Sequence, residues 1–477
     1  MEKAPTAYVD LWGYEFGLSE WQFFLLVVVL ALILHGFYVI CRRPFRAWRE
    51  SRRARIWRSE ETPAVVSAPD QATGLPSDSS LGPIEIESIQ LRNFRGISQL
   101  NLDFTKESTL SGNWTCIAGI NGAGKSSILQ AIVVGLLGSD LVTEMGRRSL
   151  SNMRRKVADI SADAEILATV REGTGRQELY LPISEFGVDE EKLAKRSDLT
   201  EMHAAWKRLR RQLLAGYGAT RNLSRFIDTR YERTSLEVQR QMTMFDSAAQ
   251  MADVNVLLGG DDDKPAAETF RRLVDRALNE DDIRTERSGG KVKFVQHSTH
   301  VDALDLPDGY RSTVAWMADF CAGWHAVHPD QSHGVDPDRL TGIVLLDEIG
   351  LHLHPTLEGS LISKLRRALP KVQFIVTTHS PLVLASFDRN ELIILDRNEE
   401  DGLKELDRQV FGMSMDDVYE WLMGTSPGSD VVKELIDDGM NEEAALYLYQ
   451  SKDYDEEEAR DRLDRRREVA RRLREGS

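Results

Sequence analysis

The chain has 477 residues and a formal net charge of −16, so it is long enough for a large core and more than one structural unit. The first 58 residues hold nine Lys and Arg against five Asp and Glu, which gives them +4 and leaves −20 on the rest. A body this acidic excludes indiscriminate binding of nucleic acid, although a local basic groove stays compatible with it. The cysteines Cys41, Cys116 and Cys321 are too widely spaced for a metal pattern and indicate a reducing compartment.

The first predicted element is an apolar segment at Trp21–Ile40, in which only Gln22 and His35 are notably polar. As a helix, it would extend roughly 30 Å, the thickness of a bilayer core. A cleaved signal peptide, the alternative, calls for a basic start and a small-residue cleavage site, whereas acidic residues precede this segment and arginines follow it. We therefore predict an extracytoplasmic N-terminus over residues 1–20 and a transmembrane helix over residues 21–41.

A basic juxtamembrane segment follows at residues 42–58, with eight arginines against the single acid Glu50. The positive-inside rule places this side in the cytoplasm, where anionic lipid headgroups are the expected partners. Residues 59–83 are rich in Ser, Pro, Asp, Thr and Gly without periodicity, which predicts a flexible linker. The expected location is thus the inner (cytoplasmic) membrane, with one span and a cytoplasmic body.

A glycine-rich motif, G-x-x-x-x-G-K-S, occupies Gly119–Ser126 between an apolar segment at 114–118 and a helical pattern at 127–137. This strand–loop–helix setting predicts a phosphate-binding loop rather than an ordinary glycine turn, because backbone N–H groups and a helix N-terminus both attract anions. Lys125 would reach the β- and γ-phosphates, and the Ser126 hydroxyl would hold Mg²⁺. The predicted nucleotide-binding residues are Gly119, Asn121, Gly122, Ala123, Gly124, Lys125, Ser126 and Ser127.

Patterns on both sides of this loop predict the rest of the body. Alternation at Ile84–Phe104 indicates two strands that turn at Arg95-Gly96, and a hairpin is expected over Ala164–Ile183. A mainly helical insert is expected at about residues 186–290. A strand at 291–295, a turn at 305–312 and a helix at 313–326 follow.

Two further apolar segments end in polar side chains. Gly342–Leu346 is followed by Asp347 and Glu348, and the segment that begins at Gln373 ends in His379. Alone, such residues are more typical of turns and caps. Beside a phosphate loop they match the needs of phosphoryl transfer, which takes a carboxylate for Mg²⁺, a group that orients water and a γ-phosphate sensor at the carboxyl ends of strands. The predicted catalytic residues are Lys125, Glu348 and His379, and the predicted Mg²⁺ ligands are Ser126 and Asp347. A helix at 357–369 and a strand at 391–396 complete this region.

These stretches resemble the ABC-type ATPases of the RecF/SMC and OLD group. The matching sequences are IQLRNFRG at 89–96, GINGAGKSS at 119–127, LPDGYRS at 306–312, VLLDEIGLHLHP at 344–355 and TTHSP at 377–381. The resemblance covers about residues 84–400. Together with VFGMSMDDV near the C-terminus, these stretches are similar to ATPase subunits of bacterial anti-phage systems such as Septu and some retrons.

The resemblance implies an α/β P-loop fold of the ABC-ATPase head type, with a mixed sheet, helices on both faces and a helical insert. It implies that two heads sandwich two ATP molecules, that Arg95 lies near the phosphates, and that a signature stretch contacts the nucleotide of the second subunit. The signature residues are Asp308, Gly309, Arg311 and Ser312. Pro307 departs from the usual Ser, the insert is too short for an SMC-type coiled coil, and the tail at 401–477 is too short for the OLD nuclease. That tail is expected to be helical and to cap the body; docking a partner protein is the alternative.

Three functional hypotheses follow. The leading one is a membrane-anchored ATPase that binds ATP and Mg²⁺, dimerises head to head and uses hydrolysis to regulate a protein effector encoded nearby, in anti-phage defence. The second is a DNA-processing or DNA-tethering ATPase at the membrane, which the acidic body disfavours. The third is a non-hydrolysing nucleotide sensor that gates a toxic membrane assembly, which Pro307 keeps open.

Overall fold

The computed structural model describes residues 7–11, 14–18, 83–105, 108–157, 160–224, 229–231, 234–259, 264–278, 283–296 and 299–396, with a few positions from 402 to 418. The chain divides into two compact units, Met1–Ser79 and Ser80–Ser477. In the first unit the described part is an antiparallel hairpin of β1 (Ala7–Leu11) and β2 (Tyr14–Leu18). The predicted transmembrane helix, basic segment and linker lie outside the described residues, as does nearly all of the tail. Among the described helices, only α2 (Lys125–Glu144) is long and apolar enough to cross a membrane, and 78% of its apolar window is buried inside the domain.

A six-stranded sheet forms the centre of the second unit, in the order β11-β17-β18-β5-β19-β20. Neighbouring strands are parallel except β19 and β20, so the sheet is mixed, as expected. Strands β17 and β18 are buried along their whole length, as strands covered on both faces should be. The strand bounds are β5 Asn113–Gly119, β11 Leu214–Tyr217, β17 Gly342–Leu346, β18 Val372–Thr377, β19 Leu392–Leu395 and β20 Leu403–Lys404.

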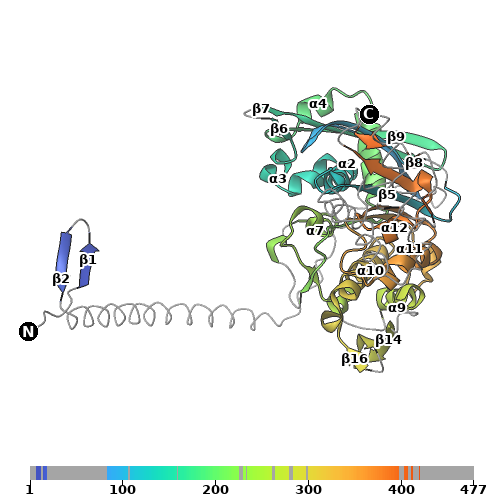
Figure 1. Ribbon diagram of the computed structural model, residues 1–477. Helices are drawn as coiled ribbons and strands as arrows, with labels where there is room; N and C mark the ends of the chain where they lie inside the picture. Colours follow the sequence, from blue (N-terminus) through green and yellow to red (C-terminus); the bar gives the residue numbers. More distant parts are fainter. Residues whose placement is uncertain are drawn as a thin grey trace, which may run out of the picture. The chain divides into compact units, whose positions relative to one another are not determined.

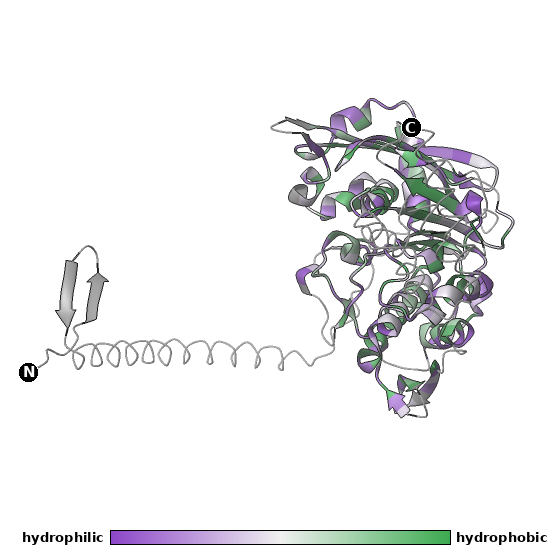
Figure 2. Cartoon of the chain, in the orientation of Figure 1, coloured by the Kyte–Doolittle hydropathy of each residue, from purple (hydrophilic) through white to green (hydrophobic). Residues whose placement is uncertain are grey.

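Alternate residues of these strands enter two different cores. Ile117, Leu345 and Ile375 face the core that contains α2, while Cys116 and Phe374 face the core that contains three other helices. Those helices are α9 (Pro265–Leu278), α10 (Asp308–Val327) and α11 (Pro355–Ala368). Figure 1 shows α9 and α10 across β5 from β8 and β9, and Figure 2 shows apolar residues concentrated in the central strands.

A second, antiparallel sheet covers α2, in the order β10-β9-β8-β3-β4. It confirms both predicted hairpins. Its bounds are β3 Ile84–Phe94, β4 Ile97–Asp103, β8 Ala164–Glu172, β9 Gly175–Ser184 and β10 Gly187–Val188. The buried Gln373 of β18 links the sheets, because its Oε1 accepts from the Ile86 N–H at 2.8 Å and its Nε2 donates to the Ile86 carbonyl at 2.9 Å.

The helix α2 is kinked at Gly138, where φ is 79° and ψ is 170°. Trp206 of α5 (Leu199–Leu209) fills the kink, and its indole donates to the Gly135 carbonyl at 2.9 Å. A Cβ at Gly138 would lie 2.6 Å from that indole, so glycine is required there. The segment that carries α5 is therefore fastened to the helix that follows the phosphate loop.

The expectation of a helical insert over 186–290 is only partly right. The helices are present as α4 (Glu190–Ala194), α5, α6 (Leu236–Gln239), α7 (Met242–Phe245), α8 (Val254–Leu257) and α9. However, Leu214–Tyr217 forms β11, the edge strand of the central sheet, which periodicity could not predict because four residues with one glycine carry too little pattern. The region also contains β12 Leu223–Ser224, β13 Met251–Ala252 and β14 Ile283–Ser288. Two strands follow it, β15 Lys291–Gln296 and β16 Thr299–Val301. The remaining elements are α3 Arg147–Ser151, β6 Arg155–Val157, β7 Ile160–Ala162, η1 Thr229–Tyr231, η3 Ala303–Asp305, η4 Pro337–Arg339, α12 Pro381–Leu384 and η5 Arg389–Glu391.

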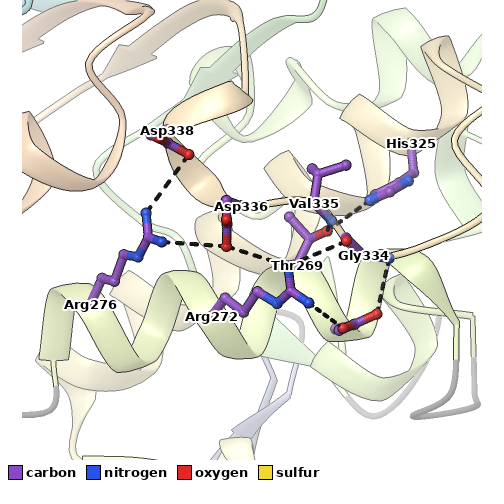
Figure 3. A network of polar contacts seen from close by, with 9 residues as sticks. Thr269, Arg272, Arg276, His325, Gly334, Val335, Asp336 and Asp338 are labelled. Carbon is purple, nitrogen blue, oxygen red and sulfur yellow. Dashed lines mark hydrogen bonds and ion pairs between the residues drawn. The ribbon is translucent and has the colours of Figure 1, made fainter.

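A polar network fastens the segment before β17 to α9 (Figure 3). Arg272 and Arg276 of α9 both reach Asp336, at 3.3 and 3.4 Å. Thr269 accepts from the Val335 N–H at 2.9 Å and lies 2.9 Å from Nε2 of His325. The entry to β17, the strand that ends in the two predicted carboxylates, is thereby held against two helices.

Candidate nucleotide-binding site

The predicted phosphate loop connects β5 to α2 and depends on left-handed glycines. Gly119, Gly122 and Gly124 have φ of 145°, 79° and 110°. A Cβ on Gly119 would lie 2.7 Å from the Leu395 carbonyl oxygen, so the close packing of β5 on β19 excludes other residues. The helix α2 begins at Lys125 with no side-chain cap and no acid in its first turn, so its N-terminal N–H groups lack a side-chain acceptor. Such a helix start is suited to a phosphate.

Lys125 is 6% exposed and directs its ammonium group back over the loop. Its Nζ donates to the Gly119 carbonyl at 2.9 Å and lies 3.8 Å from Oε1 of Glu348. Of the other predicted loop residues, Gly119 is buried, Asn121 and Gly122 are exposed, and four are half-buried: Ala123, Gly124, Ser126 and Ser127.

The carboxyl ends of β17 and β18 bring the remaining predicted residues to the same edge of the sheet. The Thr377 hydroxyl donates to Oδ1 of Asp347 at 2.6 Å and accepts from the Glu348 N–H at 2.8 Å. His379 follows β18, and its Nδ1 lies 2.9 Å from Oε2 of Glu348. Glu348 thus lies between the Lys125 ammonium group and the His379 imidazole, and the three side chains come from the carboxyl ends of β17, β5 and β18.

Glu348 adopts a left-handed backbone with φ of 50°, which costs about 1–3 kcal/mol for a residue with a side chain. Strain of this kind needs surrounding contacts to maintain it, and two side chains supply them. Thr377 binds the Glu348 N–H, and Arg221 donates to the carbonyls of Asp347 at 2.5 Å and Glu348 at 3.1 Å.

Arg221 and Thr377 were not predicted as site residues. Thr377 lies in the TTHSP stretch two residues before His379, so its position in the sequence could have indicated a place in the site. Arg221 lies 126 positions before Asp347, and no spacing in the sequence connects the two. Burial lowers the pKa of Arg221 to about 10, and the nearby charges of Asp347 and Glu348 act in the opposite direction.

The signature residues form the first turn of α10, which corrects the predicted turn at 305–312. A Pro-Asp-Gly sequence is typical of turns, but Pro307, with φ of −52°, is the N-cap from which the helix starts at Asp308. A Cβ on Gly309 would lie 2.4 Å from the His352 carbonyl oxygen, so only glycine fits against the segment that follows β17. Arg311 forms an ion pair with Asp308, and the Ser312 hydroxyl donates to the Gly309 carbonyl at 2.9 Å.

Arg95 lies in the β3–β4 turn with φ of 50°, and its N–H donates to the Met153 carbonyl at 2.7 Å. Its Nε is buried and has no hydrogen-bond partner within the described part of the chain, and burial lowers its pKa. Ile97 of the same turn lies 3.7 Å from where a Cβ of Gly124 would stand. The turn therefore borders the start of α2, where a guanidinium N–H without an acceptor fits a phosphate.

The residues present fit ATP with Mg²⁺. Lys125 and the start of α2 can hold phosphates, and Ser126 with Asp347 can hold the metal. The described residues contain no group of three or more His, Cys, Asp and Glu suited to a metal ion. A hydroxyl and one carboxylate are the sparse protein ligand set that Mg²⁺ takes when waters and phosphate oxygens complete its shell.

The fold and this edge of the sheet define the class: a P-loop α/β nucleotide-binding domain. Comparison with protein families is consistent with this. Residues 88–282 match the family described as "AAA domain", and residues 301–385 match the family described as "AAA domain, putative AbiEii toxin, Type IV TA system".

The individual relatives that the chain resembles include a Septu protein and a retron probable ATPase. The chain is 29% identical over 316 residues to the Septu protein PtuA of Bacillus mycoides, covering 66% of this chain and 41% of PtuA. It is 32% identical over 117 residues to the "Retron Ec83 probable ATPase" of Escherichia coli, covering 24% of this chain and 21% of that protein. The chain thus spans less than half the length of the curated relatives it matches. A solved SMC head from Pyrococcus furiosus shares 14% identity, with 69% of this chain and 97% of that chain covered and a TM-score of 0.41.

Proposed function

We propose that this chain hydrolyses ATP with Mg²⁺ and uses the reaction to regulate a partner protein in anti-phage defence. The observation that carries the ATPase proposal is the arrangement of Lys125, Glu348 and His379 at one edge of the sheet, beside an uncapped helix start. The matches to AAA domains and to a retron probable ATPase support the same activity, and the match to the Septu protein PtuA supports the role in anti-phage defence.

In this proposal each residue has one task. Lys125 and the N–H groups at the start of α2 bind the β- and γ-phosphates, while His379 contacts the γ-phosphate. The Glu348 carboxylate orients the attacking water and accepts its proton. Ser126 and Asp347 hold Mg²⁺, which offsets phosphate charge when bound. Thr377 positions both carboxyl-end residues through its single hydroxyl.

The test is Glu348→Gln, which keeps the size of the side chain and removes the base. Hydrolysis should fall by about 10²- to 10⁴-fold, with ATP affinity changed little. Glu286→Gln, on the exposed surface of β14, is the matched control and should hydrolyse ATP at the wild-type rate. A Glu348→Gln protein that hydrolyses ATP like the wild type would show that Glu348 is not the base.

Head-to-head dimerisation is the second part of the proposal. The first turn of α10 carries Asp308, Gly309, Arg311 and Ser312, and a second subunit would present this turn to the nucleotide. With Mg·ATP, the Glu348→Gln protein should elute as a dimer on size-exclusion chromatography with light scattering, and without nucleotide as a smaller species. A monomer at saturating ATP contradicts the ATP sandwich.

Membrane anchoring is the third part and rests on the apolar segment at 21–41 and the arginines after it. A variant lacking residues 1–41 should move from the membrane fraction to the soluble fraction, and its retention in membranes would refute the anchor.

For the defence role, phage plating should be measured with the gene in its native neighbourhood, wild type against Lys125→Ala. Equal plaque counts in both strains would argue against a nucleotide-dependent defence.

A further inference from the structure

Arg221 is a buried cation whose contacts are unusual for its charge. It is 3% exposed, and every hydrogen bond recorded for it goes to a backbone carbonyl. Its Nη1 donates to Gly218 at 2.8 Å and to Asp347 at 2.5 Å, and its Nη2 donates to Glu348 at 3.1 Å. A guanidinium group that binds carbonyls orients the peptides that carry them, because its donors lie in one plane.

Two of the three peptides that Arg221 binds lie on either side of the Glu348 Cα and so set the direction of the Glu348 side chain. Thr377 holds the same stretch from the other side, through the Glu348 N–H at 2.8 Å and the Ile349 N–H at 3.0 Å. The Glu348 and Ile349 N–H groups therefore bond to Thr377, whereas the Asp347 and Glu348 carbonyls bond to Arg221. The Asp347 N–H donates to the Tyr217 carbonyl of β11 at 2.9 Å. With φ of 50° at Glu348, loss of either set of contacts leaves a strained backbone free to relax.

Arg221 itself is held rigidly. The loop between β11 and Arg221 packs on α7, where the Gly218 N–H donates to Oγ1 of Thr243 at 3.2 Å. A Cβ on Gly218 would lie 2.0 Å from the Thr243 carbonyl oxygen, so this contact tolerates only glycine. The position of Arg221 is thus set by the edge strand β11 and the short helices after it, not by the segment that it supports.

We propose that Arg221 is a positioning residue that holds the Asp347–Glu348 backbone so that the Glu348 carboxylate faces the attacking water. The inference rests on the ATPase activity proposed above. It gives a role in that activity to Arg221, which has no predicted contact with nucleotide or metal and would act through Glu348. It also explains why a basic side chain occupies a buried position against backbone oxygens.

The experiment measures kcat and KM for ATP in the full chain carrying Arg221→Met or Arg221→Lys, together with nucleotide binding and thermal unfolding. We expect Arg221→Met to lower kcat by about 10- to 100-fold, as removal of a supporting residue does around other sites, with KM changed less than about threefold. Arg221→Lys retains the charge and should recover part of kcat. Arg240→Lys is the matched control, since only 12% of the Arg240 side chain is exposed and it pairs with Asp319 of α10 instead. It should leave kcat of the folded protein unchanged.

A double-mutant cycle separates positioning from general damage. If Arg221 acts through Glu348, adding Arg221→Met to Glu348→Gln should lower the residual rate less than about twofold. The inference is overturned if Arg221→Met lowers kcat by the same factor in the wild type and in Glu348→Gln, or if Arg221→Met has the wild-type kcat. In either case the proposed hydrolysis through Glu348 would still hold. A wild-type protein that does not hydrolyse ATP, or does so equally with Glu348→Gln, overturns the proposed function and this inference with it.

Discussion

The charged side chains at the two ends of the central sheet differ in how closely they pair and how far they are exposed. At the carboxyl end, Lys125 and Glu348 are 3.8 Å apart, Glu348 is strained, and the His379 side chain is 51% exposed. At the amino end, Arg366 of α11 and Glu391 form a bidentate pair at 2.7 and 2.5 Å, with side chains 6% and 1% exposed.

Both members of the amino-end pair have further partners. Arg366 also donates to the Ser111 carbonyl at 3.0 Å and lies 5.3 Å from the Trp114 ring, while Glu391 accepts from the Asp388 N–H at 3.0 Å. The bidentate contact between Arg366 and Glu391 pairs two buried charges and holds the strands at this end in place. The Lys125–Glu348 contact is longer, at 3.8 Å, so these two groups remain able to bind a ligand. We therefore expect substitutions at the amino end to change stability and those at the carboxyl end to change activity.

The largest effect on stability is expected from Arg366→Met, which leaves Glu391 as a buried charge without its partner. The free energy of unfolding should fall by about 3–5 kcal/mol in urea denaturation. The double variant Arg366→Met with Glu391→Leu should recover much of that loss, because no buried charge remains. Equal losses in both variants would contradict this account of the amino end.

Lys125→Ala should weaken ATP binding by about 100-fold or more, because two charge-assisted hydrogen bonds to phosphate are lost. Its thermal unfolding without nucleotide should match the wild type, since the Lys125–Glu348 contact is long. Titration with a fluorescent ATP analogue and a melting curve measure the two quantities. A large fall in melting temperature would place Lys125 with the structural charges instead.

Gln373→Leu tests the link between the two sheets and should cost about 1–3 kcal/mol, because the Ile86 N–H and carbonyl would lose their buried partner. Gln99→Leu, on the exposed face of β4, is the control and should have little effect. Urea denaturation of both proteins gives the comparison, and similar stabilities would refute the link.

The smallest effect concerns the two described cysteines, Cys116 and Cys321, which are buried. Burial raises the pKa of both thiols, and the negative charge of Glu348 adds to the effect at Cys116. A raised pKa keeps a thiol protonated as the pH increases, so at pH 8 neither should react with a thiol reagent in the native protein. In a Cys41→Ser background, denaturant should expose both thiols, and rapid labelling of the native form would contradict their burial.

The positions of the predicted site residues at one edge of the sheet were largely predictable because they follow from short motifs. The phosphate loop, the two carboxylates after β17 and the histidine after β18 are each local patterns, and parallel strands bring their carboxyl ends together. The predicted start of α10 was five residues too late, because a Pro-Asp-Gly sequence is compatible with both a turn and a helix start. Arg95 was placed from a resemblance, and the turn that carries it does border the phosphate loop.

By itself the sequence determined the P-loop, the order of the strands that carry Asp347, Glu348 and His379, and the acidic character of the body, because these follow from residue type and nearest-neighbour spacing. Only the tertiary structure decided that Leu214–Tyr217 is the edge strand of the sheet and that Arg221 supports Glu348 from there. It also decided the left-handed backbone of Glu348 and the buried Arg366–Glu391 pair at the opposite end. Each of these depends on contacts between segments far apart in the chain, whose energy no local pattern records.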